Sequence, residues 1–213
     1  FHSNVTADDP VSKAYFGQSV ALSGDMMAVG ARNADPNGAG AVYLFRQSGD
    51  EWIQVAKIVP FDGKKNDQFG FSIAIFGDTM AVGARRVNLT KEGWEGATYL
   101  FSLDSEPFDL ITKLNASDAN PGDEFGQSVS FAGNILAVGA WRDDVNGNEN
   151  QGSVYLFKKV DDQWNKVDKI TASDGSAGDE FGYSLAAFGN RLVTGAHFAD
   201  SKAGTAYVIP VRL

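Results

Sequence analysis

The chain has 213 residues and a formal net charge of −9, from 18 Lys and Arg against 27 Asp and Glu. A surface of that sign repels nucleic-acid phosphates and anionic lipid, so we expect neither as a partner. A content of 43% hydrophobic and 12% aromatic residues is enough to form a buried core, which excludes a disordered chain. No apolar run approaches the roughly 18 residues that insert across a bilayer, and the chain has no cysteine for disulfides or thiolate metal sites.

Four short motifs recur along the chain in the same order. Phe-Gly and Gly-Ala pairs both step by 53, 56 and 56 residues, beginning at Phe16, Phe69, Phe125 and Phe181 for the first pair and at Gly30, Gly83, Gly139 and Gly195 for the second. The sequence Gly40-Ala-Val-Tyr-Leu-Phe45 has counterparts that begin at Gly96, Gly152 and Gly204. An aromatic residue five positions before a lysine occurs at Trp52, Phe108 and Trp164, which we expect to pack between repeats. The chain is therefore an internal repeat of about 55 residues.

Each repeat predicts four short strands, which in the first repeat are 17–22, 26–31, the Val-Tyr-Leu-Phe run at 42–45, and 52–59. Gly24-Asp25 is typical of a two-residue hairpin turn, because glycine supplies the positive φ that such turns need. The second strand is continuously apolar, which indicates burial on both faces. The fourth alternates apolar and polar residues and is expected at an exposed edge.

Four-stranded units that repeat in this way predict an all-β, four-bladed β-propeller of antiparallel blades, forming a single domain. The blades span about 10–62, 63–118, 119–174, and 175–213 plus 1–9. Residues 4–9 align with residues 169–174, so we expect the N-terminal strand to complete the last blade and close the ring. A two-chain assembly stays open as an alternative. The chain begins at Phe1 rather than Met, as a processed protein or an excised domain would.

This set of motifs resembles the FG-GAP repeat of integrin α subunits and of many extracellular proteins. The resemblance covers essentially the whole chain and implies a propeller exposed to the extracellular space. The sequence departs from the family where Arg32, Arg85, Trp141 and His197 replace the proline of the motif. It departs again between the first and second strands, where a Gly-Asp or Gly-Asn turn stands in place of the calcium loop of many members. Integrin-type calcium sites are therefore not expected.

Acidic loops precede the first strands of the later repeats. Their carboxylates could hold a calcium ion through oxygen ligands, and the candidate metal ligands are Asp62, Asp67, Asp118, Asp123, Asp174 and Asp179. The alternative, which repetition favours, is that each aspartate caps its own turn. A second candidate calcium loop spaces Asp144, Asn146 and Asn148 two residues apart but lacks the bidentate acid of such loops. Its alternative is an ordinary Asn-Gly turn.

Variable residues behind each Gly-Ala pair are the strongest candidates for binding. Loops that leave second strands and loops that enter first strands share one face of a propeller, so Arg and aromatic side chains would stand beside the aspartates. Such a face suits a glycan or protein ligand, and the candidate residues are Arg32, Arg85, Arg86, Trp94, Trp141, Arg142 and His197. The alternative is that the arginines pair with neighbouring aspartates and that Trp141 covers blade edges.

Catalytic motifs are sparse in the sequence, although its many Asp and Glu residues leave a paired-carboxylate hydrolase open as an alternative. The two histidines, His2 and His197, form no zinc-site pattern, and no nucleophile elbow or phosphate loop occurs. We therefore predict a secreted or cell-surface recognition or adhesion module that is not an enzyme. The alternative is a structural or assembly domain of a larger surface protein with no small ligand. Sequons at Asn4, Asn88 and Asn115 would permit glycosylation.

Overall fold

The computed structural model of the protein describes residues 4–35, 37–90, 93–104 and 106–211. Predictions that fall on Phe1 and His2 lie outside these residues. In chain order the elements are β1 (Phe16–Ser23), β2 (Met26–Ala31), β3 (Ala41–Ser48), β4 (Glu51–Ile58), β5 (Phe69–Phe76), β6 (Thr79–Ala84), β7 (Ala97–Ser102), β8 (Leu110–Leu114), β9 (Ser128–Ala132), β10 (Ile135–Ala140), β11 (Ser153–Val160), β12 (Gln163–Ile170), β13 (Phe181–Phe188), β14 (Arg191–Ala196), the short turn α1 (Ala199–Lys202) and β15 (Thr205–Pro210).

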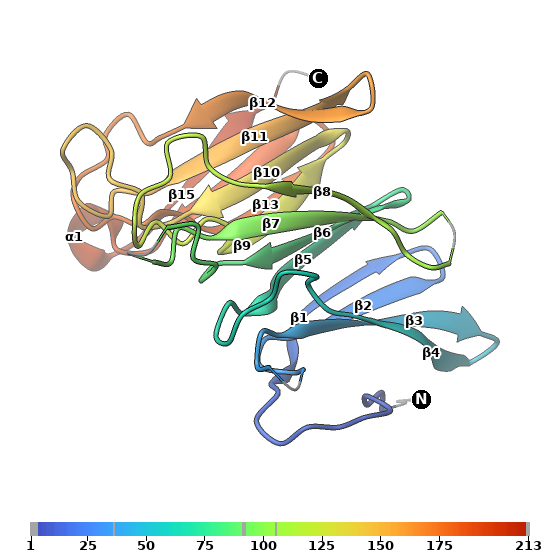
Figure 1. The fold of residues 1–213 in the computed structure, drawn as a ribbon. Helices are drawn as coiled ribbons and strands as arrows, with labels where there is room; N and C mark the ends of the chain where they lie inside the picture. Colours follow the sequence, from blue (N-terminus) through green and yellow to red (C-terminus); the bar gives the residue numbers. More distant parts are fainter. Residues whose placement is uncertain (1–3, 36, 91–92, 105, 212–213) are drawn as a thin grey trace.

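The strands form four antiparallel sheets, one for each repeat. Three sheets have four strands in sequence order, β1 to β4, β5 to β8 and β9 to β12, and the described part of the fourth has β13 to β15. The sheets follow one another in sequence order from the blue to the red end of the chain (Figure 1). This arrangement confirms the predicted blades of a propeller. Among the described residues, no helix is long and apolar enough to cross a bilayer.

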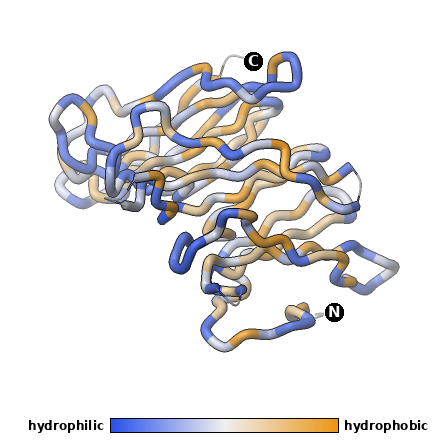
Figure 2. Tube along the Cα trace, in the orientation of Figure 1, coloured by the Kyte–Doolittle hydropathy of each residue, from blue (hydrophilic) through white to orange (hydrophobic). Residues whose placement is uncertain are grey.

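The predicted turns and burial patterns are confirmed as well. Gly24 has a φ of 58° and stands in a two-residue turn, since Ser23 pairs with Met26 across it. The second strand of the third sheet, β10, is buried along its whole length, whereas β12 at the sheet edge is mostly exposed. Hydrophobic residues concentrate along the strands and hydrophilic residues in the loops (Figure 2).

The hydrophobic core lies between neighbouring sheets, which approach closely. Gly139 in β10 leaves room for the Gly182 carbonyl oxygen of the next sheet, because a Cβ added there would lie 2.1 Å from that oxygen. The predicted packing role of the edge aromatics is confirmed: Trp164 packs on the core between the second and third sheets, with its ring 6.2 Å from that of Phe131. Phe108 packs likewise on the core between the first and second sheets, whereas Trp52 packs on the core of the first sheet and the N-terminal segment.

Closure of the ring is not shown. In the described part of the chain, residues 4–10 contain no strand and the β13–β15 sheet has no fourth strand. Val5 and Ala7 instead pack on the core of the first sheet, and Asp9 forms an ion pair of 2.5 Å with Lys57. Residues 4–10 accordingly lie beside the first sheet, away from β15 (Figure 1).

Candidate functional site

At one end of every sheet, the residue before Phe-Gly meets the residue after Gly-Ala. This follows from the pairing of the inner strands, in which Phe16 pairs with Ala31 and the second and fourth repeats pair alike. In the third repeat the Gly126 N–H donates to the Gly139 carbonyl. We call this series of residues the rim; its members are Tyr15 and Arg32 in the first blade, Gln68 and Arg85 in the second, Glu124 and Trp141 in the third, and Glu180 and His197 in the fourth. The two rim residues of each blade contact each other.

The four contacts differ in chemistry although their positions are the same. The guanidinium of Arg32 lies 4.4 Å from the ring centroid of Tyr15. Arg85 Nε donates to Gln68 Oε1 at 2.8 Å. In the third blade Trp141 Nε1 donates to Glu124 at 3.2 Å, and in the fourth His197 Nε2 lies 3.2 Å from Glu180 Oε2. A constant backbone thus presents a different pair in each blade.

Residues that follow Phe-Gly connect the rim from blade to blade. Arg85 stacks over the ring of Phe71 at 3.9 Å and donates to Gln127 at 2.8 Å. Tyr183 packs edge-on against Trp141, with ring centroids 5.3 Å apart, and lies 4.1 Å from His197. Arg32 lies 6.0 Å from the ring centroid of Phe71, so the rim residues contact one another from the first sheet to the fourth.

Left-handed backbone positions build the rim. Tyr15, Gln68, Glu124 and Glu180 have φ values of 58°, 61°, 52° and 60°. Side chains with a Cβ seldom adopt this region, and such residues concentrate at binding and catalytic sites when the surrounding structure holds them there. The loop therefore turns at a position where glycine would be easier, and in every blade it carries a larger side chain there instead.

Glu124 is the centre of the rim and is buried, with 1% of its side chain exposed. Its carboxylate lies 3.1 Å from Arg85 Nη1 and 3.9 Å from Arg86 Nε and from Arg142 Nη1. Burial lowers the pKa of the Arg85 guanidinium, and the charge of Glu124 opposes that effect. One carboxylate thus positions three arginines and, through its hydrogen bond, Trp141.

The predicted ligand residues lie together along the rim, with one difference in accessibility. Arg85, Arg86, Trp141 and Arg142 surround Glu124, and Arg86 lies 4.7 Å from the ring of Trp94. Arg32 and His197 lie in the first and fourth blades, on either side of this centre. Trp141 is only 8% exposed, so it covers blade edges, as the alternative interpretation held. The exposed aromatic residues on this face are instead Tyr15, Trp94, Tyr183 and Phe198, at 51%, 45%, 39% and 43%. The last three contact Arg86 or His197 and are counted with the rim from here on.

The first group of candidate metal ligands caps turns. Asp67, Asp123 and Asp179 each accept the backbone N–H of the residue three positions earlier, at 2.8, 2.7 and 2.7 Å. Burial raises the pKa of Asp123 to about 6, and the neighbouring charges of Asp143 and Asp144 act in the same direction. Hydrogen bonds from the backbone of the same turn are what the turn-capping interpretation predicts.

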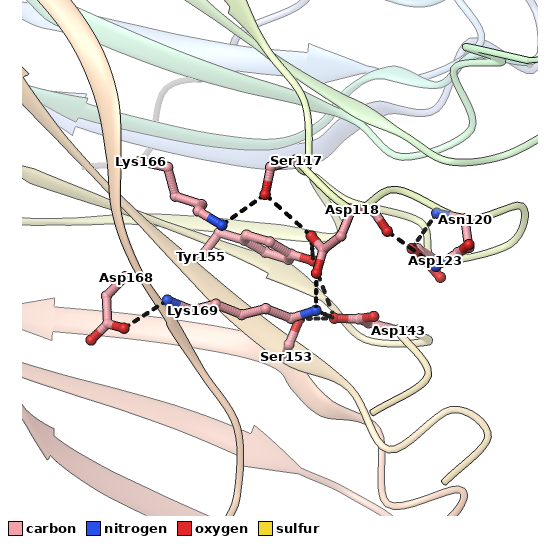
Figure 3. Close-up of polar contacts among 10 residues, drawn as sticks. All are labelled: Ser117, Asp118, Asn120, Asp123, Asp143, Ser153, Tyr155, Lys166, Asp168 and Lys169. Atoms are coloured by element: carbon pink, nitrogen blue, oxygen red, sulfur yellow. Dashed lines mark hydrogen bonds and ion pairs between the residues drawn. The ribbon is translucent and has the colours of Figure 1, made fainter. Parts of the chain in front are cut away.

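The second group joins one blade to the next. Asp118 accepts the Tyr155 hydroxyl at 2.8 Å and forms an ion pair with Lys169 at 2.7 Å (Figure 3). Asp62 meets Tyr99 and Lys113 in the same way, and Asp174 accepts from Tyr207. Although burial opposes it, the hydrogen bonds from Lys169 and Tyr155 hold the pKa of Asp118 below its usual value.

The third blade adds a second carboxylate to this contact. Asp143, 1% exposed, lies 2.6 Å from Lys169 Nζ and accepts hydrogen bonds from Ser153 and Tyr155. Figure 3 shows the ammonium of Lys169 between Asp118 and Asp143. Burial acts to lower the pKa of Lys169, but its hydrogen bonds to these carboxylates raise it above the ordinary value.

The loop of the second calcium candidate is closed by its own hydrogen bonds. Asp144 accepts the Asn150 N–H at 2.8 Å, Asn146 has a φ of 53° beside Gly147, and the Asn148 amide donates to Gln151 at 2.8 Å. Within the described ranges, no group of three or more His, Asp or Glu residues is placed to hold a metal ion. The sequon residues Asn4, Asn88 and Asn115 are exposed.

Comparisons with known proteins identify the family and the fold. The FG-GAP repeat model matches residues 2–45, 52–101, 108–157 and 164–209, so the chain belongs to the FG-GAP repeat family. No curated protein matches the chain. Among solved structures it is similar to Sqt1 of Saccharomyces cerevisiae, at 10% identity and a TM-score of 0.51, over 86% of this chain and 43% of that one. The chain thus spans less than half the length of Sqt1, and the likeness shows the fold alone.

Proposed function

We propose that this chain is an extracellular recognition module, not an enzyme, and that its rim binds a glycan or a protein ligand. Membership of the FG-GAP family and the propeller fold indicate a binding or structural module. Fold does not determine the ligand, so the proposal depends on the surface itself.

The observation that carries the proposal is the combination of a repeated backbone with side chains that change from blade to blade. Exposed Tyr15, Trp94, Tyr183 and Phe198 offer aromatic faces, and Arg86 lies over one of them. Aromatic faces stack on the apolar side of sugar rings, while arginine and carboxylate groups bond their hydroxyls. Aromatic residues and arginine are also the residues enriched where proteins bind each other.

A glycan array with the purified chain tests the proposal. We expect specific binding that falls at least tenfold on Trp94→Ala or Tyr183→Ala, because a stacking face of about 1.4 kcal/mol or more is lost. Phe61→Ala is the matched control, since Phe61 is 74% exposed and does not belong to the rim. Equal binding by all three variants would refute a role for the rim, and a protein ligand captured from a surface-protein library should show the same ranking.

The extracellular location has its own support and test. Three sequon asparagines are exposed, which is what attachment of a glycan requires. Secretion of the chain from eukaryotic cells, followed by mass spectrometry, is expected to show glycan at one or more of them. The alternative function, a structural or assembly domain, is favoured by the apolar surfaces of the first and last sheets.

A further inference from the structure

Neighbouring sheets meet through the same contacts at each of their three interfaces. A serine hydroxyl donates to the glycine carbonyl of the next Phe-Gly pair, from Ser19 to Gly70 at 2.8 Å, from Ser72 to Gly126 at 2.9 Å and from Ser128 to Gly182 at 2.7 Å. A glycine beside each serine makes room for that carbonyl, since a Cβ at Gly30, Gly83 or Gly139 would lie 2.1 Å from its oxygen. Each interface therefore has a serine–glycine side and a Phe-Gly side.

The fourth sheet has a serine–glycine side that nothing covers in the described structure. Ser184 and Gly195 occupy the same positions, but a Cβ added to Gly195 would meet only Ser184 within 4 Å. Around them Val193 is 37% exposed and Val208 is 65% exposed. Their counterparts in the third sheet, Ala137 and Leu156, are 0% and 5% exposed, because the fourth sheet covers them.

The first sheet has the complementary side, and its inner strand β1 is uncovered among the described residues. Gly17 has a φ of 87°, close to the 83° of Gly70, yet a Cβ on Gly17 would meet nothing within 4 Å. A Cβ on Gly70, at the same position in the second sheet, would lie 2.6 Å from a carbonyl oxygen of the first sheet. Val20 and Leu22 are 67% and 65% exposed, so apolar surface is open there too.

The N-terminal segment marks where a preceding blade would lie. Asp9 pairs with Lys57 at 2.5 Å as Asp62, at the end of the first blade, pairs with Lys113 at 2.6 Å. Val5 and Ala7 fill the core beside the first sheet, as Ile58 fills the core beside the second. The segment thus occupies the place of a preceding fourth strand, and among the described residues the sheet without a fourth strand is β13–β15.

We propose that the β13–β15 sheet of one chain docks head to tail on the β1–β4 sheet of a second copy. Both halves of the interface are present on one chain, and they lie at opposite ends of the row of sheets (Figure 1), so a copy satisfies both. Such a heterologous contact closes into a ring when its rotation allows. The Phe76 ring lies 6.0 Å from Phe131 of the next sheet. Phe188 and Leu22 hold the corresponding positions, so Phe188 of one copy packs on Leu22 of the other.

Molar mass in solution gives the first test. We expect light scattering to show a concentration-dependent rise from the 22.8 kDa of one chain to assemblies of two or more copies. Phe188→Asp and Val208→Asp should weaken association at least tenfold, whereas the exposed control Phe61→Asp should not, and circular dichroism checks that each variant folds. A monomer at every concentration, or equal association by all three variants, overturns the proposal.

Cysteine cross-linking decides between a second copy and closure within one chain. The chain contains no cysteine, so Leu22→Cys and Phe188→Cys each carry a single thiol. With a short bis-maleimide reagent, a mixture of the two variants should give a cross-linked dimer, and each variant alone should give none, because the contact is not symmetric. In a chain with both substitutions, a cross-link within one molecule that persists on dilution would show that the ring closes on itself and would overturn docking of a second copy.

Discussion

Replacement of Lys169 by methionine tests how much the third blade depends on its buried ion pair. The ammonium lies 2.7 Å from Asp118 and 2.6 Å from Asp143, whose side chain is only 1% exposed. Removing one partner of a buried pair costs about 3–5 kcal/mol. Because Lys169 itself is 23% exposed, water replaces part of the interaction, and we expect a loss of about 2–3 kcal/mol of unfolding free energy.

The first blade supplies a matched control. Lys57 makes the same contact with a single carboxylate, Asp9, which is 52% exposed, so Lys57→Met should cost at most about 1 kcal/mol. Urea unfolding at pH 7 measures both variants. At about 2–4 °C per kcal/mol for a chain of this size, Lys169→Met should melt about 4–12 °C lower than the parent.

Equal losses for the two variants would refute the reasoning, because burial of Asp143 would then contribute nothing. A double-mutant cycle sharpens the result. With Asp143→Asn already present no buried charge is left unpaired, so Lys169→Met in that background should cost clearly less than it does in the parent.

Two further predictions concern packing and pH. Gly139→Ala should cost about 3 kcal/mol, because its Cβ would lie 2.1 Å from the Gly182 oxygen; Gly195→Ala should cost under about 1 kcal/mol in a dilute monomer, where only the Ser184 hydroxyl is near. Equal losses in urea unfolding would contradict this account. The pKa of Asp123 is raised to about 6 in the folded state from about 3.9 in the unfolded chain. Its contribution to stability is therefore full below about pH 4 and is lost as the pH rises through 6. Asp123→Asn should flatten the decline in unfolding free energy over that range, and an unchanged pH profile would contradict the shift.

The fold could be predicted from the sequence because the repeat fixes several features at once. The strand predicted at 26–31 is β2 as observed, and the Gly24 turn joins it to β1 with the expected register. Each short motif alone predicts little, but its recurrence in the same order in four repeats predicts the four-stranded unit. Ring closure depends on how far each sheet turns relative to its neighbour, which no local motif encodes.

The site was predicted only in part, since its contacts cross between repeats. In the sequence Lys113 stands five residues before Asp118, but its ammonium binds Asp62 of the preceding repeat, because the chain leaves each blade beside the next one. Glu124 was missed as the centre of the rim. It stands directly before Phe-Gly, and extending the motif by one residue would have placed it beside Trp141 in the same series as the other rim positions.

Internal repetition also separates structural residues from candidates for function. Residues with a structural role recur, as the serine–glycine contact does at each of the three interfaces between sheets. The rim instead changes along its length, from Tyr15 with Arg32 in the first blade to Glu180 with His197 in the fourth. Arginine therefore lies toward the first-blade end of the rim and carboxylate toward the fourth-blade end. Glu124 and its three arginines lie between them. A ligand bound along the whole rim would contact arginine at one end and carboxylate at the other. Binding there should therefore fix the orientation of the ligand as well as its position.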